Sequence, residues 1–230
     1  MNIAHWLANP AVSLALTLLC YAVAVTLHRR WRWIPPIVAA CLPIMIFLLL
    51  VHEPCAQYNQ GGDLLTWLLG PATVGLAVPM YRNGQALRRS LPKLALIVLI
   101  GSIVGMTTAG LTAWLLGAPL PVVFSTVPKS VTTPIAIEVC RELGGVPQIT
   151  IAMVILAGIL GASFGLPLLR LAKVHDDRAI GAAIGTGSHG VGTASLVRHS
   201  ELQAATSSWA MAAAGIFTSL LAALLKLFLR

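Results

Sequence analysis

Charged side chains are scarce in this chain of 230 residues, since only 10% are Asp, Glu, Lys or Arg. Soluble domains carry roughly 25% of such residues. Hydrophobic residues make up 57% of the sequence, and no charged tail or low-complexity segment interrupts them. The composition excludes an ordinary soluble protein and predicts a single integral membrane domain.

Cysteine is equally sparse, and the common catalytic and nucleotide-binding motifs are absent. The four cysteines are Cys20, Cys41, Cys55 and Cys140. They have no CxxC spacing, so we expect neither a disulfide framework nor a metal site. The chain has no P-loop lysine and no GxGxxG sequence after a strand. Ser188 and His189 are adjacent in sequence and cannot face each other on a helix. We therefore expect neither a cofactor nor an enzymatic activity.

Acidic residues number 7 against 15 lysines and arginines, which gives a net charge of +8. Most basic residues fall in short loops between apolar runs, as in membrane proteins, rather than on a nucleic-acid-binding surface. The basic loops are 28–33, 81–93 and 170–178, whereas 51–63 and 117–124 lack lysine and arginine. We expect the basic loops and the C-terminus in the cytoplasm and the N-terminus outside. No basic segment or clear cleavage site marks the first apolar run, so we expect a retained helix.

Apolar segments of membrane-crossing length recur along the chain. A crossing helix needs about 20 mostly apolar residues. Six segments fit this requirement: 10–27, 34–51, 64–80, 94–116, 149–169 and 204–229. Two more, 121–139 and 179–197, are apolar but rich in Gly, Pro, Ser or Thr. The pattern predicts an all-α polytopic membrane protein with broken helices.

The segment 121–139 contains Pro128 and Pro134, which break helices. If the segment crossed the membrane once, the basic loop 170–178 would lie outside. If it entered and returned to the same side, every basic loop would lie inside. We therefore expect a re-entrant segment, which is permitted only where protein or water covers its backbone. A broken helix that spans fully is the alternative.

An offset of 115 residues relates apolar segments in the two halves of the chain. The pairs are 34–51 with 149–166, 68–79 with 183–194, and 94–113 with 209–228. We predict two inverted repeats, 1–116 and 117–230, in which the members of each pair run in opposite directions, as in many secondary transporters. Chance spacing of helices in a polytopic protein is the alternative.

Lys129 lies inside an apolar segment, where a charge costs at least about 2.5–3.5 kcal/mol on insertion scales. A bound anion or Glu138 would provide a partner. Three hydroxyl residues follow the lysine: Ser130, Thr132 and Thr133. Together with the N–H groups at the start of a helix after Pro134, they favour a carboxylate ligand. Snorkelling of Lys129 to the membrane interface is the alternative.

Two further interrupted segments complete the candidate site. The first contains Pro71 and Thr73, and a simple packing kink is its alternative explanation. The second is rich in glycine and contributes four polar residues: Thr186, Ser188, His189 and Thr193. Since histidine titrates near physiological pH, His189 is a candidate for proton coupling, as is Glu138. A tight helix crossing through small residues is the alternative for this second segment. We predict that the three interrupted segments converge on one cavity.

These interrupted segments carry a family resemblance that covers almost the whole chain. The matching stretches are "LLGPATVGLAVPMY" (68–81), "STVPKSVTTPIAIEV" (125–139) and "IGTGSHGVGTA" (184–194). They resemble the LrgB/CidB family, which includes the YohK-type inner-membrane proteins. Gly187 departs from the alanine usual in that family. The resemblance implies a fold similar to the cation/proton antiporters and anion transporters, with inverted repeats and crossing broken helices.

The same resemblance implies two functions. In the first, the protein pairs with a small LrgA/CidA-type membrane protein as a holin/antiholin-like regulator of murein hydrolase export and autolysis. In the second, it carries small monocarboxylates, as the similar plastidial glycolate/glycerate translocator does. We predict a secondary transporter of glycolate, glycerate, pyruvate or a similar small monocarboxylate that is coupled to protons and acts with the LrgA/CidA-type partner. The regulator is the alternative. The small-residue segment 210–225 could pack on a second copy or internally.

Overall fold

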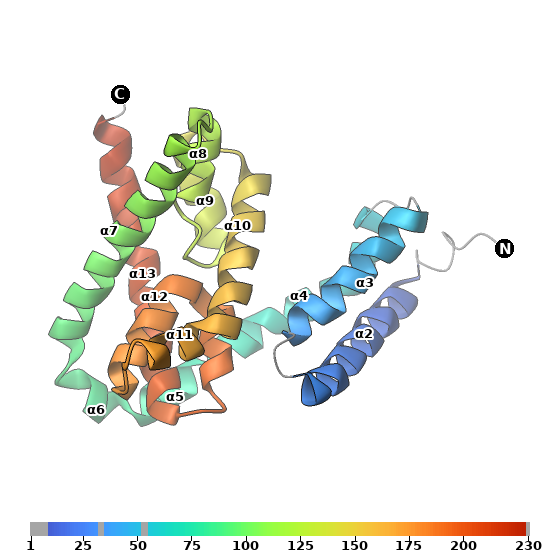
Figure 1. Cartoon of the computed structure of the whole chain (residues 1–230), viewed down its shortest axis with the longest axis horizontal. Coiled ribbons are helices and arrows are strands. Elements are labelled where there is room, and N and C mark those ends of the chain that lie inside the picture. Colours follow the sequence, from blue (N-terminus) through green and yellow to red (C-terminus); the bar gives the residue numbers. More distant parts are fainter. Residues whose placement is uncertain (1–8, 32–34, 52–54, 229–230) are drawn as a thin grey trace. The chain divides into compact units, whose positions relative to one another are not determined.

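The computed structural model describes residues 9–31, 35–51 and 55–228, which form helices and connecting turns (Figure 1). The prediction of an all-helical fold is confirmed for these residues. Five helical stretches among them are long and apolar enough to cross a membrane. The chain packs as two compact units, residues 1–75 and 76–230.

In its described residues, the first unit contains three helices: α2 (Pro10–Arg30), α3 (Pro36–Val51) and α4 (Cys55–Gly75). α2 packs against both other helices. Its contact with α4 is close because Gly61 has no side chain, and an added Cβ would lie 2.1 Å from Ser13 Oγ. Nearby, the Thr17 and Tyr58 hydroxyls share a hydrogen bond of 2.6 Å. These contacts join α2 to α4 through small and polar side chains.

The interruption expected at Pro71 is absent, so this prediction is wrong. α4 continues through Pro71 to Gly75, and a single turn residue, Leu76, separates it from α5. Proline removes one backbone hydrogen bond, but the remaining backbone stays helical, and Leu76 itself keeps helical angles (φ −69°, ψ −18°). The predicted segment 64–80 is therefore part of one helical stretch, Tyr58–Arg82, that is long enough to cross a membrane.

The second unit contains the remaining helices. They are α5 (Ala77–Arg82), α6 (Gly84–Arg88), α7 (Leu91–Leu115), α8 (Leu120–Thr126), α9 (Thr133–Leu143), α10 (Pro147–Leu160), the π-helix η1 (Gly161–Gly165), α11 (Leu166–Leu171), α12 (Asp177–Leu196) and α13 (Glu201–Phe228). α7, α13 and the continuous stretch α10–η1–α11 are long enough to cross a membrane. The shorter helices lie at the ends of these three and between them (Figure 1).

α8 and α9 form a hairpin that enters beside α7 and returns to the same end, and we call it the first hairpin. α8 descends along α7, since Gly110 of α7 faces Val123 and Val127. α9 then ascends along α13, where Ile135 meets Gly215 and Val139 packs near Ala222. The break between the two arms covers residues 127–132. The chain therefore returns to the end of the unit at which α8 begins, which is the path expected of a re-entrant 121–139.

α12 is also a hairpin, which we call the second hairpin. Its helix is broken at Ser188 (φ −138°, ψ 19°) and His189 (φ 42°, ψ −140°). Ile180 on the first arm and Leu196 on the second belong to one apolar cluster, so the arms lie side by side. Just after the hairpin, Ser200 Oγ donates a hydrogen bond of 2.7 Å to Asp177 Oδ2. Both ends of α12 therefore lie on the same side of the unit.

This second hairpin corrects the predicted topology. The segment 179–197 does not cross the unit, so the basic loop before Asp177 and the last turn of α13 lie at opposite ends of α13. The loop charges predicted that both would face the cytoplasm. The two ends of a helix that crosses the membrane cannot do so.

One predicted inverted pair is also wrong. α7 and α13 run parallel, because Leu94 clusters with Ala205, Val98 with Ala210, and Met106 with Ala222. Loop charges predict the topology correctly only where each apolar segment crosses the membrane once. The wider proposal of two inverted repeats remains a prediction.

Candidate functional site

The tips of the two hairpins meet halfway along α7. A Cβ added to Gly101 would lie 3.1 Å from Thr186 Cγ2 in the second hairpin. A Cβ added to Gly105 would lie 3.8 Å from Ser130 Oγ in the first hairpin. These glycines are one helical turn apart, which corresponds to about 6 Å along the axis. Glycine at both positions lets the two tips approach the α7 backbone at nearly the same depth.

α10 contacts both tips from another direction. His189 Nε2 lies 2.9 Å from the carbonyl oxygen of Val154. Val154 is fully buried and clusters with Val131 and Ala136 of the first hairpin. One turn further along, a Cβ on Gly158 would lie 2.9 Å from His189 Cε1. One short stretch of α10 thus holds both hairpins in place.

Lys129 lies at the tip of the first hairpin and is half-buried. Its Nζ donates to Ser130 Oγ at 3.3 Å, and no ion pair joins it to a carboxylate in the described part of the chain. Glu138, which we considered as its partner, is exposed and accepts a 2.8 Å hydrogen bond from Arg141 Nη1. The structure brings Lys129 and Ser130 together but does not bring Glu138 to them.

The backbone around Lys129 is shaped by the two prolines. Pro128 is fully buried and ends the descending arm. Thr132 is extended (φ −62°, ψ 146°), and α9 begins at the next residue with Pro134 in its first turn. Thr132 and Thr133 are half-buried beside this helix start. The positive end of the α9 dipole therefore points towards the turn that carries Lys129.

The polar groups of the second hairpin bond to one another and to neighbouring helices. Ser188 Oγ donates to Ile184 O (2.8 Å) and Thr186 Oγ1 to Ala182 O (2.7 Å). Thr193 Oγ1 donates to His189 O (2.7 Å) and lies 2.8 Å from Ser207 Oγ of α13. These hydroxyl groups stabilise the fold of the hairpin. Of the four candidates in this segment, Thr186 and His189 lie nearest the first hairpin, through α7 and α10 respectively.

Sequence reasoning missed two features next to the tips. The five residues of η1 follow directly after α10, and a Cβ on its Gly161 would lie 2.1 Å from Ser188 Cβ. Such π-helical turns occur frequently at functional sites. The second feature is Ser102, whose buried hydroxyl has no hydrogen-bond partner in the described structure. Its place between Gly101 and Gly105, in the sequence "GSIVG", was the available signal.

Pro71 and Thr73 belong to the first unit, whereas the hairpins belong to the second. Their participation in the site stays a prediction.

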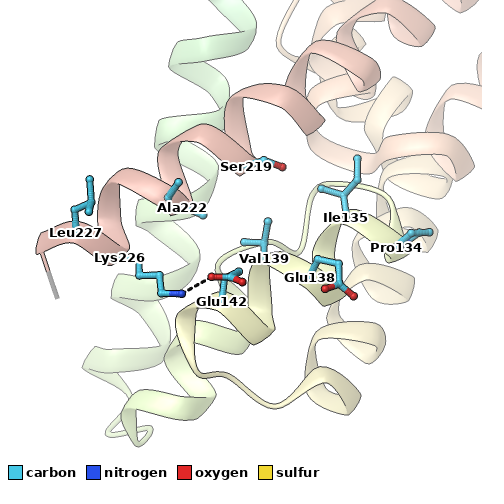
Figure 2. A pocket seen from close by; sticks show the side chains of 10 residues that line it. Pro134, Ile135, Glu138, Val139, Glu142, Ser219, Ala222, Lys226 and Leu227 are labelled. Atoms are coloured by element: carbon cyan, nitrogen blue, oxygen red, sulfur yellow. Dashed lines mark hydrogen bonds and ion pairs between the residues drawn. The ribbon is translucent and has the colours of Figure 1, made fainter. Parts of the chain in front are cut away.

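A groove of about 620 Å³ runs between α9 and α13 (Figure 2). Its inner end is formed by Pro134 and Ile135, directly after the turn of the first hairpin. Glu138 and Glu142 project into it from α9, and Lys226 of α13 forms an ion pair with Glu142 (Figure 2). The groove thus connects one end of the unit with the surroundings of the hairpin tip.

These features define a class: a multi-pass, all-helical membrane protein in which two broken hairpins enter from opposite ends and meet inside. Within that class the chain belongs to the LrgB-like family, whose model matches residues 17–228. No solved structure matches the chain.

Three curated relatives illustrate the similarity. "Uncharacterized protein YwbG" of Bacillus subtilis is 36% identical over 90% of this chain and 93% of its own length. An "Uncharacterized protein" of Haemophilus influenzae is 34% identical, with 90% of each chain covered. "Antiholin-like protein LrgB" of Bacillus mycoides is 28% identical over 91% of this chain and 93% of its own. None of these names describes an enzyme.

Proposed function

We propose that the protein is a secondary carrier of small monocarboxylates such as glycolate, glycerate or pyruvate. The observation that carries this proposal is the half-buried Lys129 at the meeting point of two hairpin tips, without a carboxylate partner in the described structure. A carrier needs a site of this kind, built from discontinuous helices near the membrane midplane.

In this proposal, Lys129 and Ser130 hold the substrate carboxylate. The Lys129 ammonium supplies the charge, and the start of α9 adds its positive dipole end. Thr132 and Thr133, which lie beside the start of α9, supply hydroxyl donors to the substrate, and Thr186 offers only its acceptor lone pairs because its proton is donated to Ala182 O. The substrate would be small, because the fully buried Val131 and Val154 close the space around the tips.

His189 is the residue proposed to couple transport to protons. A carbonyl oxygen only accepts hydrogen bonds, so the Nε2 atom that faces Val154 O carries the hydrogen. Nδ1 of the neutral ring is then an acceptor that can take up a second proton. Alternating access would follow from movement of one hairpin against the helices that clamp it. Glu138 is the second candidate for this role, from its position in the groove.

The membrane side also belongs to the proposal. With basic loops in the cytoplasm of a bacterial inner membrane, the second hairpin enters from the cytoplasm and the first hairpin from outside. The end of α13 then lies outside, and the predicted N-terminus outside is kept.

A second candidate function is regulation of murein hydrolase export with an LrgA/CidA-type partner. The name of the Bacillus mycoides relative, an antiholin-like protein, favours this candidate more than the carrier. The geometry favours the carrier, because a regulator that acts only through partner contacts has no need for a lysine that lies between two broken hairpins and has no carboxylate partner in the described part of the chain.

Uptake into proteoliposomes separates the two candidates. Radiolabelled pyruvate, glycolate and glycerate would be offered with and without a pH gradient and with and without the small partner. We expect saturable uptake that Lys129→Met abolishes and that Lys93→Met, which changes an exposed lysine at the start of α7, leaves intact. No uptake by folded protein under any condition would reject the carrier, and persistence of autolysis control in Lys129→Met cells would then support the regulator.

A further inference from the structure

The groove between α9 and α13 poses an energetic problem for a membrane protein. α9 is a re-entrant helix, yet its Glu138, Arg141 and Glu142 side chains are exposed. Charged side chains within a membrane face a protein interior or water, since exposure to lipid is costly. Together with Lys226 of the neighbouring α13, these side chains form two ion pairs, Arg141 with Glu138 and Lys226 with Glu142.

The residues at the two ends of the groove indicate what the groove could conduct. Glu142 and Lys226 lie towards its outer end, where α9 and α13 both finish. Pro134 and Ile135 lie at its inner end, and Thr133 and Thr132 precede them at the tip. Each acid of the groove has a basic partner, and Lys129 lies further in without an ion pair among the described residues, so an anion that passed along the groove would meet an unneutralised positive charge at the tip.

We propose that this groove is a water-filled vestibule through which carboxylates reach Lys129, with the Glu142–Lys226 pair at its mouth. This inference rests on the proposed carrier function for the identity of the anion, but not for the presence of water. A lipid chain or a partner helix in the groove is the competing occupant, and the apolar walls contributed by Val139, Ala222 and Leu227 would suit either.

Cysteine reactivity tests for water directly. The background protein would carry Cys20→Ala, Cys41→Ala and Cys55→Ala, and would retain Cys140, which is 0% exposed. Ser219→Cys and Ala223→Cys place a thiol on the groove wall, whereas Leu220→Cys and Leu224→Cys, each one residue further along, place it on exposed apolar positions outside the lining. The four variants would be treated in proteoliposomes with a membrane-impermeant methanethiosulfonate that carries a sulfonate.

The thiolate is the reactive form, and apolar surroundings raise the thiol pKa, so we expect groove cysteines to react about tenfold faster or more than their neighbours. Equal rates within each pair, whether slow or fast, would overturn the vestibule. Slow reaction of all four would indicate lipid or protein in the groove.

The route is tested separately by transport. Modification of Ser219→Cys should abolish pyruvate uptake, and modification of Leu220→Cys should leave it intact. If uptake continues after Ser219→Cys is fully modified, the groove is not the route. If the unmodified background shows no uptake at all, the carrier proposal fails, while the reactivity rates still decide whether the groove contains water.

Discussion

Both hairpins reverse the direction of the chain inside the protein, but their turns are built from different residues. The first turns at prolines and presents Lys129, which donates a hydrogen bond to the neighbouring Ser130 and has no ion pair among the described residues. The second turns at glycines and a histidine, and its Ser188, His189 and Thr193 side chains are all hydrogen-bonded within the protein. The first tip therefore has a charged group that can bind a ligand, whereas the polar groups of the second tip mainly stabilise the fold.

Removing the close packing of the second hairpin should have the largest effect. In Gly185→Ala, the new Cβ would lie 2.3 Å from the backbone oxygen of Ser207, which cannot move away without distorting α13. We expect a loss of about 3 kcal/mol or more, at the upper end for overpacked sites, seen as lost folded protein in size-exclusion chromatography and a lowered Tm. Gly187→Ala is the matched control, because nothing lies within 4 Å of its Cβ position. Equal stability of the two variants would contradict the packing described for this hairpin.

Lys129→Met should separate function from stability in the first hairpin. Since the lysine has no ion pair in the described structure, we expect unchanged or higher Tm together with at least a tenfold loss of uptake, or about 1.4 kcal/mol of binding free energy. A clear drop in Tm would instead mean that Lys129 supports the fold, and the contrast between the hairpins would disappear.

Substitution of His189 should reveal backbone strain in the second hairpin. Its φ of 42° is a conformation that glycine adopts freely and that costs other residues about 1–3 kcal/mol. His189→Ala loses the bond to Val154 and keeps the strain, whereas His189→Gly loses the bond and relieves it. We expect thermal unfolding to rank wild type first, His189→Gly second and His189→Ala third.

That ranking reverses the usual helix order, in which alanine is about 1 kcal/mol better than glycine. If His189→Ala is more stable than His189→Gly, the backbone at this tip is not strained.

The smallest effect should come from the clasp that closes the second hairpin at its open end. Hydrogen bonds from Gln203 and then Ser200 lower the pKa of the Asp177 carboxyl below its usual 3.8. A lowered pKa stabilises the fold above pH 3.8, and this contribution disappears as the pH falls through the folded-state pKa.

Asp177→Asn should therefore have a slightly lower Tm than wild type at pH 7, and the difference should shrink below about pH 4. Asp176→Asn is the control, because asparagine can still cap α12 through the bond that Asp176 makes to Ala179 N. A Tm difference for Asp177→Asn that is independent of pH would rule out the carboxylate clasp.

The sequence predicted the first hairpin because two separate signals favoured it over a broken helix that spans fully. Pro128 and Pro134 cannot continue a helix, and the loop charges required a return to the same side. The second hairpin could not be predicted in this way, since its glycines fit a kinked crossing equally well. Contacts between distant residues decide the matter, namely Gly181 and Gly185 against α13 and Gly161 against Ser188. The same limit applies to Ser102 and to the groove, which exist only once α7, α9 and α13 are packed.

The dependence of both hairpins on α13 has a consequence for biogenesis. Ile135 of the first hairpin meets Gly215, and Gly185 of the second meets Ser207, yet α13 leaves the ribosome after both hairpins. Neither hairpin can complete its packing until the last helix has entered the membrane. During synthesis both hairpins must therefore remain incompletely packed beside α7 and α10. Insertion of α13 then completes the packing of both.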